Sequence, residues 1–281
     1  MSKEEIAMFD MKTVLLPVDF SDRSMEAARQ ARGIARHVRC RLIVLSVAIE
    51  RDGSDVQFEP GGSSVESLQA YLNREFRDTP VEYLMEPGAP AEVIDQVARD
   101  RRADLIVIAG HNRESFEAFA LGSVAAKVLC SAPCPVWVSL HEERGPAPLF
   151  RRILCSVGQS DSTGATLDWA MQFAHAFDAA CDVIHVAANS DGQEQRRVTE
   201  DWLTRREREA LDAVKKKLDG RGKFIFAAGE RARVIASASV ALKSDLLVMG
   251  RSRSTEEIAR VHSLPFTLAR LASCPVAVIS S

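Results

Sequence analysis

The sequence contains no apolar run of the roughly 18 residues that a membrane-spanning helix requires. Its N-terminal segment, MSKEEIAMFDMK, is charged and has no apolar core of a secretory signal, so we expect a cytoplasmic protein with no membrane partner. An excess of one charge sign is also missing, because Lys+Arg 36 stand against Asp+Glu 39 and leave a formal net charge of -3. Nucleic-acid-binding domains usually carry a basic excess, so this balance argues against a nucleic-acid partner.

Several signatures of chemistry are absent as well. The six cysteines include no Cys-x-x-Cys pair, and no two of the six histidines have metal-ligand spacing, so we expect buried thiols and neither zinc nor a disulfide framework. No Gly-x-Gly-x-x-Gly or Walker A lysine motif is found, and Ser123 does not lie in a nucleophile elbow. The sequence therefore predicts no catalytic residues and no metal site.

The chain does contain an internal repeat. Val14–Asp22 matches Ile153–Asp161 at an offset of 139 residues, and Ala103–Ala109 matches Ser244–Gly250 at an offset of 141. Two further pairs of segments keep the same order and nearly the same spacing. We therefore expect two tandem domains, residues 1–142 and 150–281, because the intervening connector contains a glycine and two prolines that suit a linker.

Each copy alternates apolar runs with amphipathic helical patterns, and runs that are apolar on consecutive positions are typical of strands in parallel sheets. In the first copy the expected strands are Val14–Val18, Leu42–Val47, Glu82–Met85, Leu105–Ala109 and Val136–Leu140. The expected helices are Ala27–Val38, Val65–Phe76, Ala91–Arg99 and Leu121–Cys130, and in the second copy a long charged helix is expected over Gln195–Leu218. This order predicts an α/β fold with two tandem doubly wound domains, each with a five-stranded parallel sheet.

Ligands of doubly wound sheets bind at the carboxyl ends of the strands, where the strand order reverses. In the first copy, Asp19 lies at the end of the first strand and the segment Ala109–Arg113 lies at the end of the fourth strand. The following helix starts with Leu121–Val124. The helix start suits an anion, and the Asp19 carboxylate suits the hydroxyls or amine of a nucleoside. The pattern predicts a site for a phosphorylated nucleoside.

These segments, together with the Ala-Pro-Cys-Pro-Val tract at 132–136, resemble the universal stress protein family along the whole chain. In nucleotide-binding members the loop after the fourth strand reads Gly-x-x-Gly, nine residues, then Gly-Ser or Gly-Thr, and its backbone holds the phosphates. The resemblance implies a Rossmann-like sheet of strand order 3-2-1-4-5, ATP or AMP in the first domain, and Mg²⁺ accompanying ATP. The nucleotide-binding residues it implies are Pro17, Val18, Asp19, Val47, Ala109, Gly110, His111, Asn112, Arg113, Gly122, Ser123 and Val124.

Both copies depart from the family pattern. In the first copy the two earlier glycines fall on Ala109 and Asn112, and an alanine held at positive φ would cost about 1–2 kcal/mol. In the second copy Gly158 replaces Asp19, and Ser263-Leu264 replaces Gly122-Ser123. We therefore expect no nucleotide in the second domain, which would be structural or would bind a partner.

Three functions stay open on the sequence. The first is a non-enzymatic stress-response protein that binds an adenine nucleotide in the first domain; the second is an interaction scaffold with no nucleotide in either domain. The third is an ATP-hydrolysing or ATP pyrophosphatase-type enzyme, for which Ser156–Ser162 offers a serine-rich loop of the wrong spacing. For assembly, the apolar edge strands Val136–Leu140 and Val276–Ser280 favour an intramolecular pseudo-dimer, with a further homodimer as an open alternative.

Overall fold

The computed structural model describes residues 9–19, 21–48, 74–77, 79–110, 121–139, 150–158, 163–187, 222–251 and 263–280, with alternate residues between 212 and 220. The chain divides into two compact units. The first unit is Asp10–Pro148, and the second is Leu149–Ser281 together with Phe9. The expected boundaries assign Phe9 to the first domain, whereas the structure places it with the second unit.

The first unit is built on a parallel sheet. Its strands are β1 (Thr13–Val18), β2 (Arg41–Ala48), β3 (Val81–Pro87), β4 (Leu105–Ala109) and β5 (Val136–Ser139). They run in the order β3-β2-β1-β4-β5, and every neighbouring pair is parallel. The order therefore reverses between β1 and β4, which confirms the predicted doubly wound sheet.

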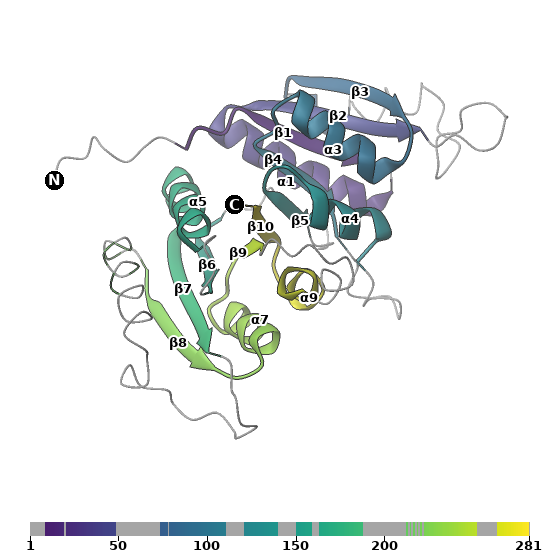
Figure 1. Cartoon of the computed structure of the whole chain (residues 1–281). Coiled ribbons are helices and arrows are strands. Elements are labelled where there is room, and N and C mark those ends of the chain that lie inside the picture. The colour runs from purple at the N-terminus through teal and green to yellow at the C-terminus, as the bar shows by residue number, and fades with distance from the viewer. Residues whose placement is uncertain are drawn as a thin grey trace. The chain divides into compact units, whose positions relative to one another are not determined.

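Helices cover both faces of this sheet. Helix α1 (Asp22–Val38) lies on one face, and α3 (Pro90–Asp100) and α4 (Ser123–Ser131) lie on the other (Figure 1). Helix α4 begins two residues later than predicted because Leu121 and Gly122 precede its first turn. Of the helix expected at Val65–Phe76, all but the last three residues lie outside the described part of the chain.

The second unit repeats this plan. Its strands are β6 (Arg152–Val157), β7 (Ala180–Ala187), β8 (Phe224–Ala228), β9 (Leu246–Arg251) and β10 (Val276–Ser280), in the order β8-β7-β6-β9-β10. Its helices are α5 (Thr163–Ala176), α7 (Arg231–Ala241) and α9 (Leu264–Leu271). Most of the helix expected at Gln195–Leu218 lies outside the described residues.

The repeat extends to single backbone features. Arg39 and Asp178 have φ of 58° and 51°, and each follows the first helix of its unit in the left-handed region. Asp104 accepts hydrogen bonds from the amides of Lys12 and Thr13, both at 2.8 Å, and thereby ties the start of β1 to the start of β4. Asp245 does the same for β6 and β9 in the second unit. The two copies therefore share the left-handed residue after the first helix and the aspartate that bonds to the strand start, in addition to the topology.

The two units differ in the position of a tryptophan that contacts the first helix of the unit or belongs to it. In the first unit Trp137 of β5 is fully buried, and its indole N–H donates to Gln30 Oε1 of α1 at 2.7 Å. At an offset of 139 the position of Gln30 is held by Trp169, and at an offset of 140 the position of Trp137 is held by Ala277. The large aromatic side chain is thus on the strand in one unit and on the helix in the other.

In the second unit Trp169 belongs to an aromatic stack along α5. Its ring stacks on Phe173 at 5.0 Å, and Phe173 stacks on Phe177 at 4.4 Å. Phe9 packs edge-on against Trp169 and Phe173, at 5.7 Å in both cases, and Phe150 packs against Phe173 at 5.5 Å. These contacts explain why Phe9 lies with the second unit.

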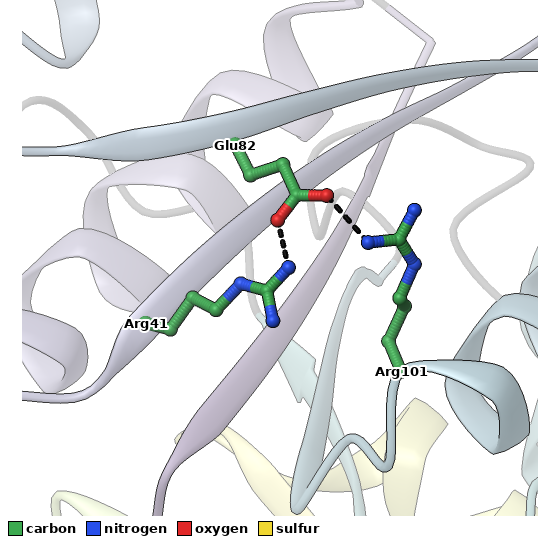
Figure 2. A network of polar contacts seen from close by, with 3 residues as sticks. All are labelled: Arg41, Glu82 and Arg101. Carbon is green, nitrogen blue, oxygen red and sulfur yellow. Dashed lines mark hydrogen bonds and ion pairs between the residues drawn. The ribbon is translucent and has the colours of Figure 1, made fainter.

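An ion cluster closes the amino-terminal edge of the first sheet, opposite the strand ends where a ligand is expected. The carboxylate of Glu82 on β3 lies between two guanidinium groups (Figure 2). One belongs to Arg41 at the start of β2, and the other to Arg101 after α3, whose Nη1 is 2.6 Å from Glu82 Oε1. The cluster joins β2, β3 and α3 at this edge, so these charges serve the fold.

The six cysteines are present as thiols. Burial raises the pKa of Cys181 to about 12, and the charge of Asp182 contributes in the same direction. Burial likewise raises the pKa of Cys40 to about 11. Because the thiolate is the reactive form, both side chains are poor nucleophiles near neutral pH.

Within the described ranges, no helix is long and apolar enough to cross a membrane. The same residues contain no group of three or more histidine, cysteine, aspartate or glutamate side chains arranged to hold a metal ion.

Candidate functional site

A cavity of about 340 Å³ opens at the carboxyl ends of β1 and β4, where the strand order of the first unit reverses. Residues at the starts of α1, α3 and α4 and at the end of β2 also line it. The volume falls at the lower end of the roughly 300–1,000 Å³ typical of small-ligand pockets. The lining residues are Pro17, Val18, Asp19, Ser21, Arg23, Ser24, Leu45, Ser46, Val47, Pro90, Ile94, Ile108, Ala109, Gly110, Gly122, Ser123, Val124 and Ala125.

Most residues that the sequence predicted for the site meet at this cavity. Nine of the twelve line it, from four separate segments: Pro17, Val18, Asp19, Val47, Ala109, Gly110, Gly122, Ser123 and Val124. The other three, His111, Asn112 and Arg113, lie outside the described residues. The topology of a doubly wound sheet explains the convergence, because β1 and β4 are neighbours although their last residues, Val18 and Ala109, are 91 positions apart in the chain.

Asp19 is held in place by the start of α1. Its Oδ1 accepts from the amide of Ser21 at 3.0 Å and from the Ser21 hydroxyl at 2.6 Å. Ser21 is the N-cap of α1, and its Oγ accepts from the amide of Ser24 at 3.3 Å. The carboxylate is exposed but oriented, so it can accept a hydrogen bond from a ligand in the cavity.

Helix α4 begins with open backbone donors. Its N-cap is Gly122, with φ -53° and ψ 147°, and no side chain caps it. The first intrahelical bond runs from the amide of Ala126 to the Gly122 carbonyl at 2.9 Å. The amides of Ser123, Val124 and Ala125 therefore have no partner within the helix. Because the dipole adds partial positive charge at this end, the arrangement suits an anion.

Gly122 leaves room for that anion. A Cβ built on Gly122 meets no atom of the described residues within 4 Å, so these residues leave the space beside its backbone open. Gly110 is different, since a Cβ there would lie 2.1 Å from the Ser139 carbonyl oxygen of β5. Gly110 is thus required by the close approach of β5, while Gly122 is not required by the packing of the protein itself.

Ala109 is the last residue of β4 and is not among the described residues with positive φ. The penalty considered for an alanine at a family glycine position therefore does not apply. The backbone at the end of β4 accommodates alanine without strain.

Sequence reasoning missed half of the lining residues: Ser21, Arg23, Ser24, Leu45, Ser46, Pro90, Ile94, Ile108 and Ala125. For Ser21, the N-cap of α1, a signal was present, because a serine shortly after a strand and before a helical pattern is a typical N-cap. The apolar members carry no such signal, since they read only as core positions of strands and helices.

The second unit has different residues at the positions of Asp19, Gly122 and Ser123. Gly158 follows β6 where Asp19 follows β1. The N-cap of α9 is Ser263, with φ -66° and ψ 153°, which is nearly the conformation of Gly122. Leu264 and Pro265 follow it, so a branched apolar side chain and a residue without an amide hydrogen occupy the helix start. This helix start is a poor anion site.

Comparisons with known proteins agree with this architecture. The model of the universal stress protein family matches residues 11–139 and 149–280. A universal stress protein of Methanocaldococcus jannaschii is 31% identical over 140 residues, which cover 45% of this chain and 81% of that protein.

Two solved structures share the fold over nearly the full length. A universal stress protein of Archaeoglobus fulgidus superposes with a TM-score of 0.73 at 20% identity and covers 97% of both chains. A putative universal stress protein of Pseudomonas aeruginosa superposes with a TM-score of 0.70 at 17% identity, covering 98% of this chain and 95% of that one. With both of its halves matched by the family model, the chain belongs to the universal stress protein family, as two tandem copies of the family's domain.

Proposed function

We propose that the first unit binds an adenine nucleotide, ATP or AMP, in the cavity at the ends of β1 and β4. The observation that carries the proposal is the meeting of Asp19, Gly122 and Ser123 around one cavity although they come from distant segments. An oriented carboxylate and an uncapped helix start then face the same space, and these are the two groups that a phosphorylated nucleoside needs.

In this proposal each group has a separate role. The Asp19 carboxylate accepts from the ribose hydroxyls or the base amine. The phosphate lies at the start of α4, where the amides of Ser123 and Val124 and the Ser123 hydroxyl donate to it. The open space beside Gly122 lets the phosphate approach the backbone. With ATP, Mg²⁺ accompanies the phosphates as their counter-ion.

The second unit, by the same reasoning, does not bind a nucleotide and is structural or binds a partner. Leu264 cannot donate to a phosphate, Pro265 has no amide hydrogen, and Gly158 offers no carboxylate. The protein then acts in the cytoplasm in a stress response, as a binding protein without catalytic turnover. A scaffold that binds no nucleotide in either unit and an ATP-hydrolysing enzyme are the two competing functions.

Titration calorimetry with ATP and with AMP tests the proposal. The intact chain is expected to bind one nucleotide per chain, and Asp19→Asn to weaken binding by about tenfold, since a hydrogen bond to a charged group contributes about 1.5–3 kcal/mol. If neither nucleotide gives a heat of binding and native mass spectrometry finds no co-purified nucleotide, the proposal fails and the scaffold function is favoured. Release of AMP or ADP during incubation with ATP would instead establish the enzyme.

For assembly we propose that the two edge strands, β5 and β10, pair within one chain to form an intramolecular pseudo-dimer. Both strands are apolar and end the sheet of their unit, and an exposed apolar edge needs covering. Small-angle X-ray scattering at several concentrations is expected to give one compact particle. Scattering from two separately moving lobes would contradict the pairing, and a doubled mass would reveal a further homodimer.

A further inference from the structure

Arg23 is a charged residue of the cavity. It lies in the first turn of α1, is exposed, and lines the same cavity as Asp19 and Ser123. It forms no ion pair with another residue in the described part of the chain. Within the described lining, Arg23 is the one cation and Asp19 the one anion.

The position of Arg23 is electrostatically unfavourable for the helix itself. The start of a helix carries partial positive charge, which repels a cation in the first turn. The rest of α1 follows the usual preference, because Arg36 and His37 lie in its last turn. Helix α3 follows it too, with Glu92 in its first turn, whereas α7 has Arg231 and Arg233 in its first turn. What adds to the dipole argument for Arg23 is that this arginine lines a cavity. A cation placed against the dipole and beside a cavity indicates an anionic ligand.

The internal repeat supports a ligand role over a structural one. At an offset of 139 the position of Arg23 is held by Ser162, so the cation is absent from the copy that also lacks the equivalents of Asp19 and Ser123. Asp104, which ties two strand starts together, does have a counterpart, because Asp245 accepts the same pair of backbone hydrogen bonds. Arg23 therefore differs between the copies together with the site residues Asp19 and Ser123.

We propose that Arg23 is a specificity-determining residue, whose guanidinium pairs with the phosphate of the ligand and makes the cavity select a phosphorylated nucleoside over the bare nucleoside. The inference rests on the proposed nucleotide site and adds a second phosphate contact, from α1, to the backbone amides at the start of α4. A guanidinium offers two parallel N–H donors to phosphate oxygens and stays charged at all physiological pH values.

The test compares AMP with adenosine by titration calorimetry, using Arg23→Gln and the control Arg36→Gln. Arg36 is also exposed on α1, at the opposite end from the cavity, so its variant changes the net charge equally. Arg23→Gln is expected to raise the Kd of AMP about tenfold and to leave that of adenosine unchanged, since a charge-assisted contact is lost and only AMP has the phosphate. Arg36→Gln is expected to change neither, and added salt to reduce the preference of the wild type for AMP.

Three results would overturn the inference. Arg23→Gln could leave the Kd of AMP unchanged, or raise the Kd of both ligands by the same factor, or act no differently from Arg36→Gln. In those cases the nucleotide site stands and Arg23 does not determine specificity. If the wild type binds neither AMP nor ATP, the proposed function fails and the role of Arg23 fails with it. Circular dichroism melting confirms that each variant is folded.

Discussion

Replacing Gly122 with serine is expected to weaken AMP binding by about 10- to 100-fold without lowering the Tm. The loss follows because a side chain would occupy the open space beside the Gly122 backbone and move the phosphate away from the amides of α4. Charge-assisted hydrogen bonds contribute about 1.5–3 kcal/mol each, and 1.4 kcal/mol corresponds to tenfold in affinity.

The fold is expected to tolerate this change, and the protein contains the precedent. Ser263 is the N-cap of α9 with φ -66° and ψ 153°, close to the φ -53° and ψ 147° of Gly122. Serine is also a favourable N-cap residue, so it stabilises a helix start at least as well as glycine does.

The matched control is the reverse change in the second unit, Ser263→Gly, which is expected to leave AMP affinity unchanged. Titration calorimetry measures both variants, and differential scanning fluorimetry reports their Tm. Unaltered AMP binding by Gly122→Ser would show that the phosphate does not lie at the start of α4. A drop in its Tm would instead mean that the helix start needs glycine for packing.

Replacing Trp137 with alanine is expected to destabilise the first unit by about 3–5 kcal/mol, the range for large-to-small changes at buried aromatic residues. Trp137 is fully buried, and its removal leaves a cavity between β5 and α1. It also removes the donor to Gln30, whose side chain is only 4% exposed and is left with an unsatisfied acceptor.

The second unit suggests how this loss can be offset. There Ala277 holds the position of Trp137, and Trp169 holds the position of Gln30 and stacks on Phe173. The double change Gln30→Trp with Trp137→Ala is therefore expected to recover about half of the stability lost by Trp137→Ala alone. Buried volume is restored and the Gln30 acceptor is removed, while Glu26 loses the hydrogen bond that the Gln30 amide donates to it.

Peptide-level hydrogen exchange is the appropriate measurement, because the two units need not unfold together and a single unfolding transition would mix them. Protection of β4 and β5 amides reports the first unit, and protection of β9 and β10 amides serves as an internal control. If the β4 and β5 amides of the double variant are as poorly protected as those of Trp137→Ala, a tryptophan on α1 does not replace the packing of the tryptophan on β5.

Much of the fold could be predicted from the sequence, since it depends on patterns local in the chain. Runs such as Val14–Val18 and Leu105–Ala109 are apolar at consecutive positions, and strands with both faces covered need that composition. The predicted strands match β1, β2, β4 and β5 to within one residue at each end, and β3 to within two. Once the strands and helices alternate, short right-handed connections leave few topologies.

The candidate site was predictable where the type of a residue and its place in a predicted element indicate a binding role. Asp19 at a strand end and Gly122-Ser123 at a helix start are such residues, and the structure brings them to one cavity. Their role in nucleotide binding stays a prediction. Arg23 was not predictable, because an arginine in a charged helix start is ordinary in sequence, and only its position beside the cavity, without an ion pair among the described residues, marks it out.

The sequence by itself determined the repeat, the two α/β domains, the positions of their strands and the inequality of their ligand-binding residues. Each of these depends on residue type and on spacing along the chain. The tertiary structure alone decided that Gly122 borders open space while Gly110 is closed in by Ser139, and that Trp137 pairs with Gln30. These are distances between segments far apart in the chain, and such distances are set by how strands and helices pack.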